Sequence, residues 1–343
     1  MDRRDERRTG VRHADPGEEP LVSVIMPVLN EERHLRDAVA MVLRQDWAGP
    51  LQVVLAVGPS SDRTEEIAAD LARADERILV VANPSGRTPD ALNAAIQAAA
   101  GEIIVRVDGH AEIPEDYISV AVQTLERTGA ENVGGLMDAQ GITPFQRAVA
   151  VAMRSRIGVG NSRFHVGGQA GETDTVYLGV FRREALERVG GYDSSFARAQ
   201  DWEMNHRIRQ SGGLVYFTPE LKVTYRPRAS VTALAKQYFH YGRWRAVVAR
   251  AHEGTLNMRY LAPPVMVSGV SAATAVGLLS SSPLRRGCAL AVPAAYLAAV
   301  VAGGVAISTD EPWSVRARTP VALVTMHWSW GVGFLSSLVD PPR

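Results

Sequence analysis

Cysteine is nearly absent from this chain of 343 residues, and neither sign of charge is in excess. The one cysteine, Cys288, lies in an apolar stretch, so the chain can form neither an internal disulfide nor a cysteine-rich metal site. Such sparse use of cysteine is typical of a catalytic domain kept in the cytoplasm. Lys plus Arg and Asp plus Glu each number 37, which leaves no overall positive charge for binding nucleic acid. We therefore predict no nucleic-acid partner.

Two glycine-rich phosphate-binding motifs are also missing. No G-x-G-x-x-G follows the first apolar run, which removes the main support for a dinucleotide-binding fold. No G-x-x-x-x-G-K-[ST] occurs, which argues against a P-loop nucleotidase. Residues 1–20 are almost wholly charged, Gly or Pro, and lack the apolar segment of a secretory signal. They predict a disordered charged tail.

Short apolar runs alternate with helical patterns from residue 21 onward, which predicts an α/β fold with a doubly wound, mainly parallel sheet. The predicted strands cover residues 21–26, 51–57, 77–82 and 102–107, and the predicted helices cover 31–43, 63–74, 89–100 and 114–127. Loops at the carboxyl ends of parallel strands meet at one edge of the sheet. We therefore expect Asn30, Glu31, Asp62 and Asp108 to lie close together. Turn formation and helix capping are the plainer roles of these residues, and for Asp62 both roles are equally supported.

The last third of the chain is apolar. Charged residues are absent from 261–279 and 287–308, and His327 is the one ionisable group in the run 319–339. Each run approaches the roughly 20 residues that cross a bilayer, so we predict about three membrane helices within residues 259–340. Buried helices of a soluble domain are the alternative.

Two segments before the apolar runs are basic and predicted to be helical. One is opened by Thr143 and Pro144, a cap followed by an early helical proline. The other, 231–250, is rich in aromatic and basic residues, and we expect an amphipathic interfacial helix over 231–258. Residues 21–230 then form the catalytic domain.

Five motifs follow one another in order in the catalytic domain. They are VIMPVLNE at 24–31, GRTPDALN at 86–93, RVDGH at 106–110, GVFRREAL at 179–186 with VGGYD at 189–193, and QDWE at 200–203. Together they resemble the inverting, metal-dependent glycosyltransferases of family 2, which have a GT-A fold. The V-D-G-H and Q-D-W-E forms and the apolar tail are most similar to bacterial exopolysaccharide transferases of the succinoglycan ExoA type. A further segment, QYFHYGRW at 237–244, loosely resembles the Q-x-x-R-W element of processive members.

The resemblance implies roles for individual residues. A divalent cation, Mn²⁺ or Mg²⁺, would be held by Asp108 and His110, and Asp201 would be the catalytic base. The nucleotide-sugar would contact Pro27, Asn30, Glu31, Asp62, Arg87, Asn93 and Asp108. The acceptor side would include Gly179, Arg182, Gln200, Trp202, Gln237, Arg243 and Trp244.

The implied activity is inverting transfer of a hexosyl group from a nucleoside diphosphate sugar, with a UDP-sugar favoured, to a hydroxyl of a lipid-linked saccharide acceptor. The implied setting is exopolysaccharide or cell-surface glycan biosynthesis. The implied location is the cell membrane, with several spans and a cytoplasmic catalytic domain.

Departures from the family pattern leave two other functions open. Gly58 stands where the family usually has an Asp, and His110 and Gln200 each replace a carboxylate. One alternative is therefore a non-catalytic, membrane-bound protein that binds a sugar nucleotide or a lipid. The other is a polyprenyl-phosphate sugar synthase, whose phosphate nucleophile needs no base. For Asp201 itself, the plainer structural role is the N-cap of a helix over 202–210.

Overall fold

The computed structural model describes residues 19–342, which divide into two compact units. The first unit contains the chain up to Leu136 together with Gln169–Val223. The second contains Met137–Gly168 and the chain from Thr224 onward. The predicted disordered tail lies outside the described residues, apart from Glu19 and Pro20.

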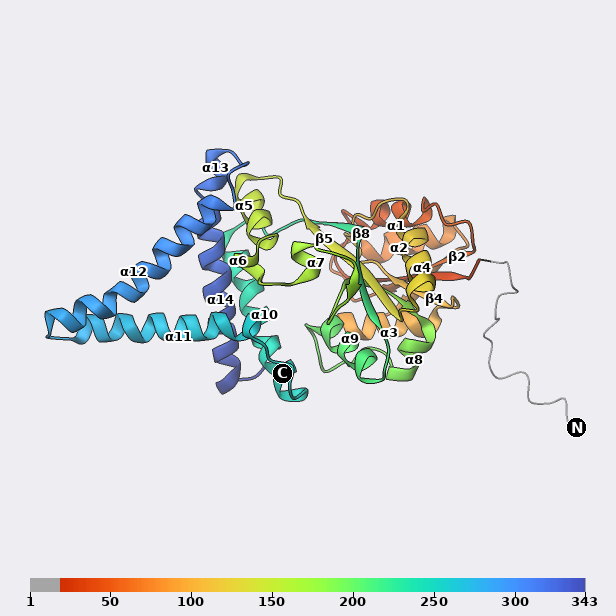
Figure 1. Ribbon diagram of the computed structural model, residues 1–343. Helices are drawn as coiled ribbons and strands as arrows, with labels where there is room; N and C mark the ends of the chain where they lie inside the picture. Colours follow the sequence, from red (N-terminus) through yellow and green to blue (C-terminus); the bar gives the residue numbers. More distant parts are fainter. Residues whose placement is uncertain (1–18, 343) are drawn as a thin grey trace, which may run out of the picture. The chain divides into compact units, whose positions relative to one another are not determined.

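Within residues 19–342, eight strands form one mixed sheet in the order β3-β2-β1-β4-β7-β5-β8-β6 (Figure 1). Their bounds are β1 Val22–Val28, β2 Leu51–Val57, β3 Ile78–Ala82, β4 Ile103–Arg106, β5 Asn132–Ala139, β6 Gly171–Glu172, β7 Tyr177–Arg182 and β8 Val215–Tyr225. The first four strands pair in parallel. Antiparallel pairs join β4 to β7, β7 to β5, and β8 to β6. The predicted α/β fold and the mainly parallel arrangement of its first half are confirmed.

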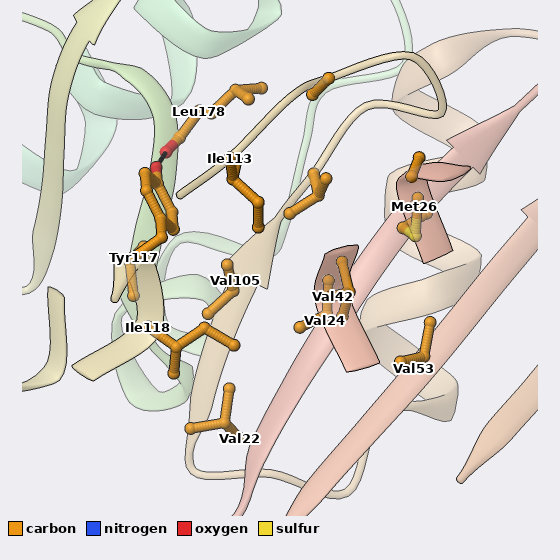
Figure 2. Close-up of a cluster of buried hydrophobic side chains, with 14 of the residues drawn as sticks. Val22, Val24, Met26, Val42, Val53, Val105, Ile113, Tyr117, Ile118 and Leu178 are labelled. Carbon is orange, nitrogen blue, oxygen red and sulfur yellow. Dashed lines mark hydrogen bonds between the residues drawn. The ribbon is translucent and has the colours of Figure 1, made fainter. Parts of the chain in front are cut away.

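Helices of the first unit cover both faces of this sheet. Their bounds are α1 Leu35–Leu43, α2 Thr64–Ala74, α3 Thr88–Ala98, α4 Tyr117–Thr128, α8 Arg183–Val189 and α9 Gln200–Gln210. Side chains alternate between the faces along a strand, so Val24 and Met26 of β1 pack with α1, α2 and α4. Ile25, between them, packs with α3, α8 and α9 instead. Figure 2 shows the first core, in which the Tyr117 hydroxyl donates to the Leu178 carbonyl at 2.9 Å.

The strand β1 ends two residues later than predicted and includes Pro27. Pairing of β1 with β4 stops at Ile25 opposite Arg106, whereas pairing with β2 continues to Val28 opposite Val57. Pro27 has no N–H, and it stands where β1 no longer pairs with β4. The strand therefore continues through a residue that usually ends one.

The antiparallel half of the sheet was not predicted as strands. Two of its strands contain residues that are rare in strands: Gly134 and Gly135 in β5, and Pro219 in β8. The glycines are required by a close backbone approach, since a Cβ at Gly135 would lie 1.8 Å from the Leu221 carbonyl oxygen. Tertiary contact rather than strand propensity decides the structure here.

The second unit is helical apart from the ends of β5 and β8. Its helices are α5 Pro144–Met153, α6 Arg156–Val159, α7 Arg163–Val166, α10 Val231–Ala251, α11 Met258–Leu279, α12 Pro283–Ala306, α13 Trp313–Arg316 and α14 Thr319–Val339. The predicted start of α5 is confirmed. The Gln146 N–H donates to Thr143 Oγ1 at 3.3 Å, and the Thr143 N–H donates to Gln146 Oε1 at 3.0 Å.

Among the described residues, three helical segments are long and apolar enough to span a membrane. They are Met258–Leu279, Pro283–Ala306 and Trp313–Val339. The segment 231–258, predicted to be interfacial, contains α10, one face of which is covered by α14. A Cβ at Gly242 would lie 2.1 Å from the Trp330 carbonyl oxygen, so the two backbones are in contact.

Candidate active site

Asp201, the predicted base, and Asp108, a predicted metal ligand, both bind the same arginine, Arg106. Asp108 follows β4, Asp201 lies in the first turn of α9, and Arg106 is the last residue of β4. Arg106 Nε and Nη2 donate to Asp108 Oδ1 at 3.1 and 3.0 Å, and Arg106 Nη1 donates to Asp201 Oδ1. The arginine side chain is 5% exposed, against 22% for Asp108 and 36% for Asp201. The arginine is therefore buried beneath two partly accessible carboxylates.

Burial and neighbouring charges shift the pKa values of Asp201, Arg106 and Tyr192. Burial raises the pKa of Asp201 above its ordinary value; the nearby Asp108 carboxylate raises it too, and Arg106 opposes both. Burial by itself would lower the pKa of Arg106, but the two carboxylates outweigh it and hold that pKa well above the usual range. Burial and Asp201 likewise raise the pKa of Tyr192 above its ordinary value. The result is a buried guanidinium held between two carboxylates.

Asp201 is not the N-cap of its helix. The N-cap of α9 is Ala199, and Asp201 is the second residue of the helix, with its carboxylate directed to Arg106. The N-cap alternative for Asp201 is therefore wrong. Ala199 has a backbone φ of 60°, a left-handed conformation that is strained for a residue with a Cβ.

Glu31 and His110 pair beside Asp108. Glu31 Oε1 and His110 Nδ1 are 2.7 Å apart. A Cβ on the intervening Gly109 would lie 3.1 Å from Glu31 Cγ, so the glycine leaves room for this pair. A carboxylate on Nδ1 fixes the tautomer and ring orientation of an imidazole, as it does for metal-bound histidines.

The side chains around Asp108 fit a cation that is bound partly by the protein and partly by a diphosphate. No group of three or more His, Cys, Asp or Glu side chains suited to a metal occurs among residues 19–342. A Mg²⁺-like ion is commonly bound by one or two carboxylates, with substrate phosphates and water completing the shell. Asp108, whose second carboxylate oxygen is not used by Arg106, matches that pattern, and the neighbouring His110 would add an imidazole ligand.

Asn30 and Asp62 organise the loops at the edge of the sheet. Asn30, at a φ of 57°, accepts the Ser61 N–H on its Oδ1 at 2.8 Å. Asp62 accepts the N–H groups of Thr64 at 3.0 Å and Glu32 at 3.2 Å, and the Thr64 hydroxyl bond lowers its pKa. The expected proximity of Asn30, Glu31 and Asp62 is therefore found, with hydrogen bonds that stabilise the turns.

Asn93 and Asp90 of α3 are bonded to the loop that precedes α9. The Asn93 side chain donates to the Tyr192 carbonyl at 2.7 Å and accepts the Tyr192 N–H at 2.8 Å. Asp90 accepts from Arg87 Nε at 3.0 Å and from the Ser194 hydroxyl. The amide of Asn93 is thus engaged by backbone, while the half-exposed Arg87 lies at the start of α3.

The residues predicted on the acceptor side lie on several elements and in both units. Gln200 and Trp202 share the first turn of α9 with Asp201, and the Trp202 ring stacks on His206 at 5.2 Å. Gly179 lies inside β7, and Arg182 lies opposite Ile103 at the start of β4, away from the edge that carries Asp108. Arg182 donates to the carbonyls of Ala130 and Leu125, both at 3.2 Å.

Gln237, Arg243 and Trp244 lie on α10 in the second unit. Gln237 Nε2 donates to the hydroxyls of Tyr225 at 2.8 Å and Tyr241 at 3.0 Å. Arg243 Nη2 donates to the Asp340 carbonyl at 2.6 Å, and Trp244 is buried.

Arg106 and Tyr192 are parts of the site that were not predicted from the sequence. A signal for Arg106 was present: it is the one charged residue in an otherwise apolar stretch, 103–107, two positions before Asp108. A cation within a buried strand needs a carboxylate partner. Tyr192 carried no comparable signal.

Comparison with known proteins places this site in a family. The model of the family "Glycosyl transferase family 2" matches residues 23–190. The succinoglycan biosynthesis protein ExoA of Rhizobium meliloti (strain 1021) is 33% identical over 331 residues, which cover 92% of this chain and 94% of that protein. The chain belongs to glycosyl transferase family 2. As a family 2 member it is a glycosyltransferase, as the sequence predicted.

Other relatives of this family 2 enzyme agree over most of its length. A dolichyl N-acetyl-alpha-D-glucosaminyl phosphate 3-beta-D-2,3-diacetamido-2,3-dideoxy-beta-D-glucuronosyltransferase of Methanococcus voltae is 24% identical, covering 93% of this chain and 97% of that protein. Among solved structures, the mannosyltransferase PcManGT from Pyrobaculum calidifontis, in complex with GDP-Man and Mn²⁺, superposes with a TM-score of 0.63 at 22% identity. That match covers 96% of this chain and 90% of the other. The predicted GT-A type fold is confirmed.

Proposed function

We propose that this family 2 glycosyltransferase transfers a hexosyl group, with inversion, from a nucleoside diphosphate sugar to a hydroxyl of a lipid-linked saccharide. The observation that carries the proposal is the pair of partly exposed carboxylates, Asp108 and Asp201, on either side of one buried arginine. One acid can face the diphosphate while the other faces the acceptor. A site that only bound a nucleotide would need no second carboxylate with a raised pKa.

Asp201 supplies the base in this mechanism. The acceptor oxygen forms a bond to the anomeric carbon as the bond from that carbon to the diphosphate oxygen breaks. The acceptor proton passes to the Asp201 carboxylate, whose raised pKa makes it a stronger base than an ordinary Asp. The electron pair of the broken bond leaves on the diphosphate, and attack from the opposite face inverts the anomeric centre.

Asp108 and His110 are the residues that would hold a divalent cation against the diphosphate. When bound, such an ion acts as a Lewis acid that compensates the charge of the leaving group. Pro27, Asn30, Glu31, Asp62, Arg87 and Asn93 are proposed on the donor side. The Asn93 amide is bound to the Tyr192 backbone. We therefore propose that Asn93 supports the donor side of the site and does not bind the nucleobase.

The lipid-linked acceptor and the membrane location rest on the relatives and on the apolar helices. The Methanococcus voltae relative is named for an acceptor sugar carried on dolichyl phosphate, and the Rhizobium meliloti relative for succinoglycan biosynthesis. Three helical segments of this chain, among residues 19–342, could cross a bilayer and keep the site near such a lipid. We therefore propose a multi-pass protein of the cell membrane that acts in exopolysaccharide or cell-surface glycan assembly, with its catalytic domain in the cytoplasm. Gln200 and Trp202, which share the first turn of α9 with Asp201, are proposed on the acceptor side.

The decisive experiment measures sugar transfer by membranes containing the full chain. Radiolabelled UDP- and GDP-sugars are supplied with lipid extract, in the presence of Mn²⁺, Mg²⁺ or EDTA. We expect transfer from one donor, a UDP-sugar, and its loss in EDTA and in Asp108→Ala. Full transfer by Asp108→Ala in EDTA would overturn the role of the cation. Donor binding without any transfer or hydrolysis would instead support the non-catalytic alternative.

A further inference from the structure

Arg106 is bound to both reacting carboxylates and is itself shielded from the substrates. Its side chain is 5% exposed, whereas the two carboxylates above it are 22% and 36% exposed. It therefore cannot be the group that touches the donor or the acceptor. Its contacts nevertheless reach both halves of the site.

The pattern of hydrogen bonds uses one oxygen of each acid. Arg106 Nε and Nη2 both donate to Asp108 Oδ1, and Nη1 donates to Asp201 Oδ1. Within residues 19–342, the side-chain hydrogen bonds of these two aspartates all end on Oδ1. Oδ2 of each carboxylate is then left for its own task, a cation at Asp108 and an acceptor proton at Asp201.

A guanidinium is suited to this arrangement because it is planar and its donors point in fixed directions. One edge of the group holds Asp108 and the opposite end holds Asp201. Asp108 lies in the loop after β4 and Asp201 lies on α9, and Asp201 is 95 positions from Arg106 in the chain. Packing of α9 and the bonds of its preceding loop to α3 place the two elements, and Arg106 is the side chain that binds both carboxylates directly.

We propose that Arg106 is a positioning residue that sets the separation and orientation of the Asp108 and Asp201 carboxylates by binding one oxygen of each. This inference rests on the proposed function, because it assigns the second oxygens to the cation and to the acceptor proton. Misplacing either group by about 1 Å costs on the order of 10²-fold in rate. A lysine at this position has a single ammonium and cannot hold both acids in one plane.

The test compares Arg106→Lys with Arg183→Lys in the purified full-length protein. Arg183 is a matched control: it is also largely buried, with Nε donating to the Gly101 carbonyl at 2.6 Å and Nη2 to the Ala99 carbonyl at 2.7 Å, but it contacts neither aspartate. For each variant we measure Tm, kcat, the donor KM and the Mn²⁺ concentration that gives half-maximal activity.

Arg106→Lys is expected to lower kcat on the order of 10²-fold. It should also raise the Mn²⁺ concentration for half-maximal activity, with little change in donor KM at saturating Mn²⁺. Arg183→Lys should lower Tm but keep the kcat and the Mn²⁺ requirement of the wild type. An Arg106→Lys protein with wild-type kcat and Mn²⁺ requirement would overturn the proposal.

If Arg106→Lys does not fold, the wild-type protein still tests the inference. A structure of the wild type with UDP and Mn²⁺ should retain the contacts of Arg106 with both aspartates, and loss of either contact would overturn it. Asp201→Asn separates this inference from the proposed function. Wild-type turnover by Asp201→Asn rejects the base itself. An inactive Asp201→Asn beside a normal Arg106→Lys rejects the positioning role alone.

Discussion

Ala199 shows how the chain brings Asp201 to Arg106. The helix α9 begins directly after Ala199, whose φ of 60° turns the preceding loop sharply into the helix. An L-residue in that conformation costs about 1–2 kcal/mol. The ion pair between Arg106 and Asp201 fixes the first turn of the helix against this strain. A residue two positions before the base therefore has a conformation that local preference alone would not select.

Asp201→Asn is the sharpest single-residue prediction. The amide keeps the shape of the side chain but removes the basic carboxylate, so transfer should slow by roughly 10²–10⁴-fold. Donor affinity should persist, because the proposed donor contacts lie on other loops. Turnover and donor affinity measured on the same preparation check both statements. Near-normal turnover would favour the polyprenyl-phosphate sugar synthase, whose nucleophile needs no base.

The pH dependence of the reaction follows from the direction of the Asp201 pKa shift. The base must be ionised, so kcat should fall as pH falls, with its midpoint above the ordinary Asp value of 3.8. Stability changes in the opposite sense across that interval: the folded state binds the proton more tightly, so this group's contribution to the free energy of unfolding decreases as pH rises. Rate profiles and thermal unfolding over the same pH range provide the measurement. An acid limb centred at or below 3.8 would contradict the prediction.

The sequence identified Asp108 and Asp201 but not the residue that joins them. Both aspartates were recognisable because they stand in family motifs at the ends of predicted elements. Arg106 pairs with a residue 95 positions away, and no local pattern encodes such a contact. The Asn93 amide shows the converse: its motif pointed to the nucleotide, while its hydrogen bonds go to Tyr192.

At the scale of elements, the start of α3 supports the loop before α9. Asp90 binds Ser85 Oγ at 2.6 Å and the Ser194 hydroxyl, and these bonds, with Arg87, lower its pKa to about 2. Asn93 adds two bonds to Tyr192 in the same loop. The helix α3, which carries proposed donor-side residues, therefore holds the loop that leads to Asp201.

Ser194→Ala tests this connection between elements. Loss of the bond to Asp90 should lower the free energy of unfolding by about 1 kcal/mol and reduce kcat, because the loop before α9 is less firmly held. Ser85→Ala is the control for kcat: it removes a bond to the same carboxylate, together with the Ser85 bonds to Asn83 and to the Arg87 N–H, but leaves the loop attached to α3. Equal kcat values for the two variants would show that the Asp90–Ser194 bond serves stability alone.

The elements also differ in how well the sequence predicted them. The four parallel strands were found because each is a short apolar run followed by a helical pattern. The strands β5 and β8 were not, because the glycines of β5 and the proline and charged residues of β8 match no strand template. The apolar run of β7 was read only as part of a family motif. Their pairing depends on partners distant in the sequence.

For the whole molecule, the main prediction concerns membrane attachment. Only 22% of the most apolar window of Met258–Leu279 and 11% of that of Pro283–Ala306 are buried by the protein itself, so most of this apolar surface needs another cover. Hydrocarbon is the natural one for helices of this length. The full chain should stay in the pellet after alkaline carbonate washing of membranes. Its release into the supernatant would show that these helices do not span the bilayer.

The contact between α10 and α14 has a consequence for how the protein is made. Gly242 of α10 lies against the Trp330 backbone, and Gly333 of α14 lies against the Phe239 backbone. Each helix therefore covers one face of the other. A ribosome finishes α10 well before it reaches α14, the last helix among the described residues. During translation, the Gly242 face of α10 has no α14 to cover it. A polypeptide that terminates early keeps that face bare, and quality-control proteases can recognise it as incomplete.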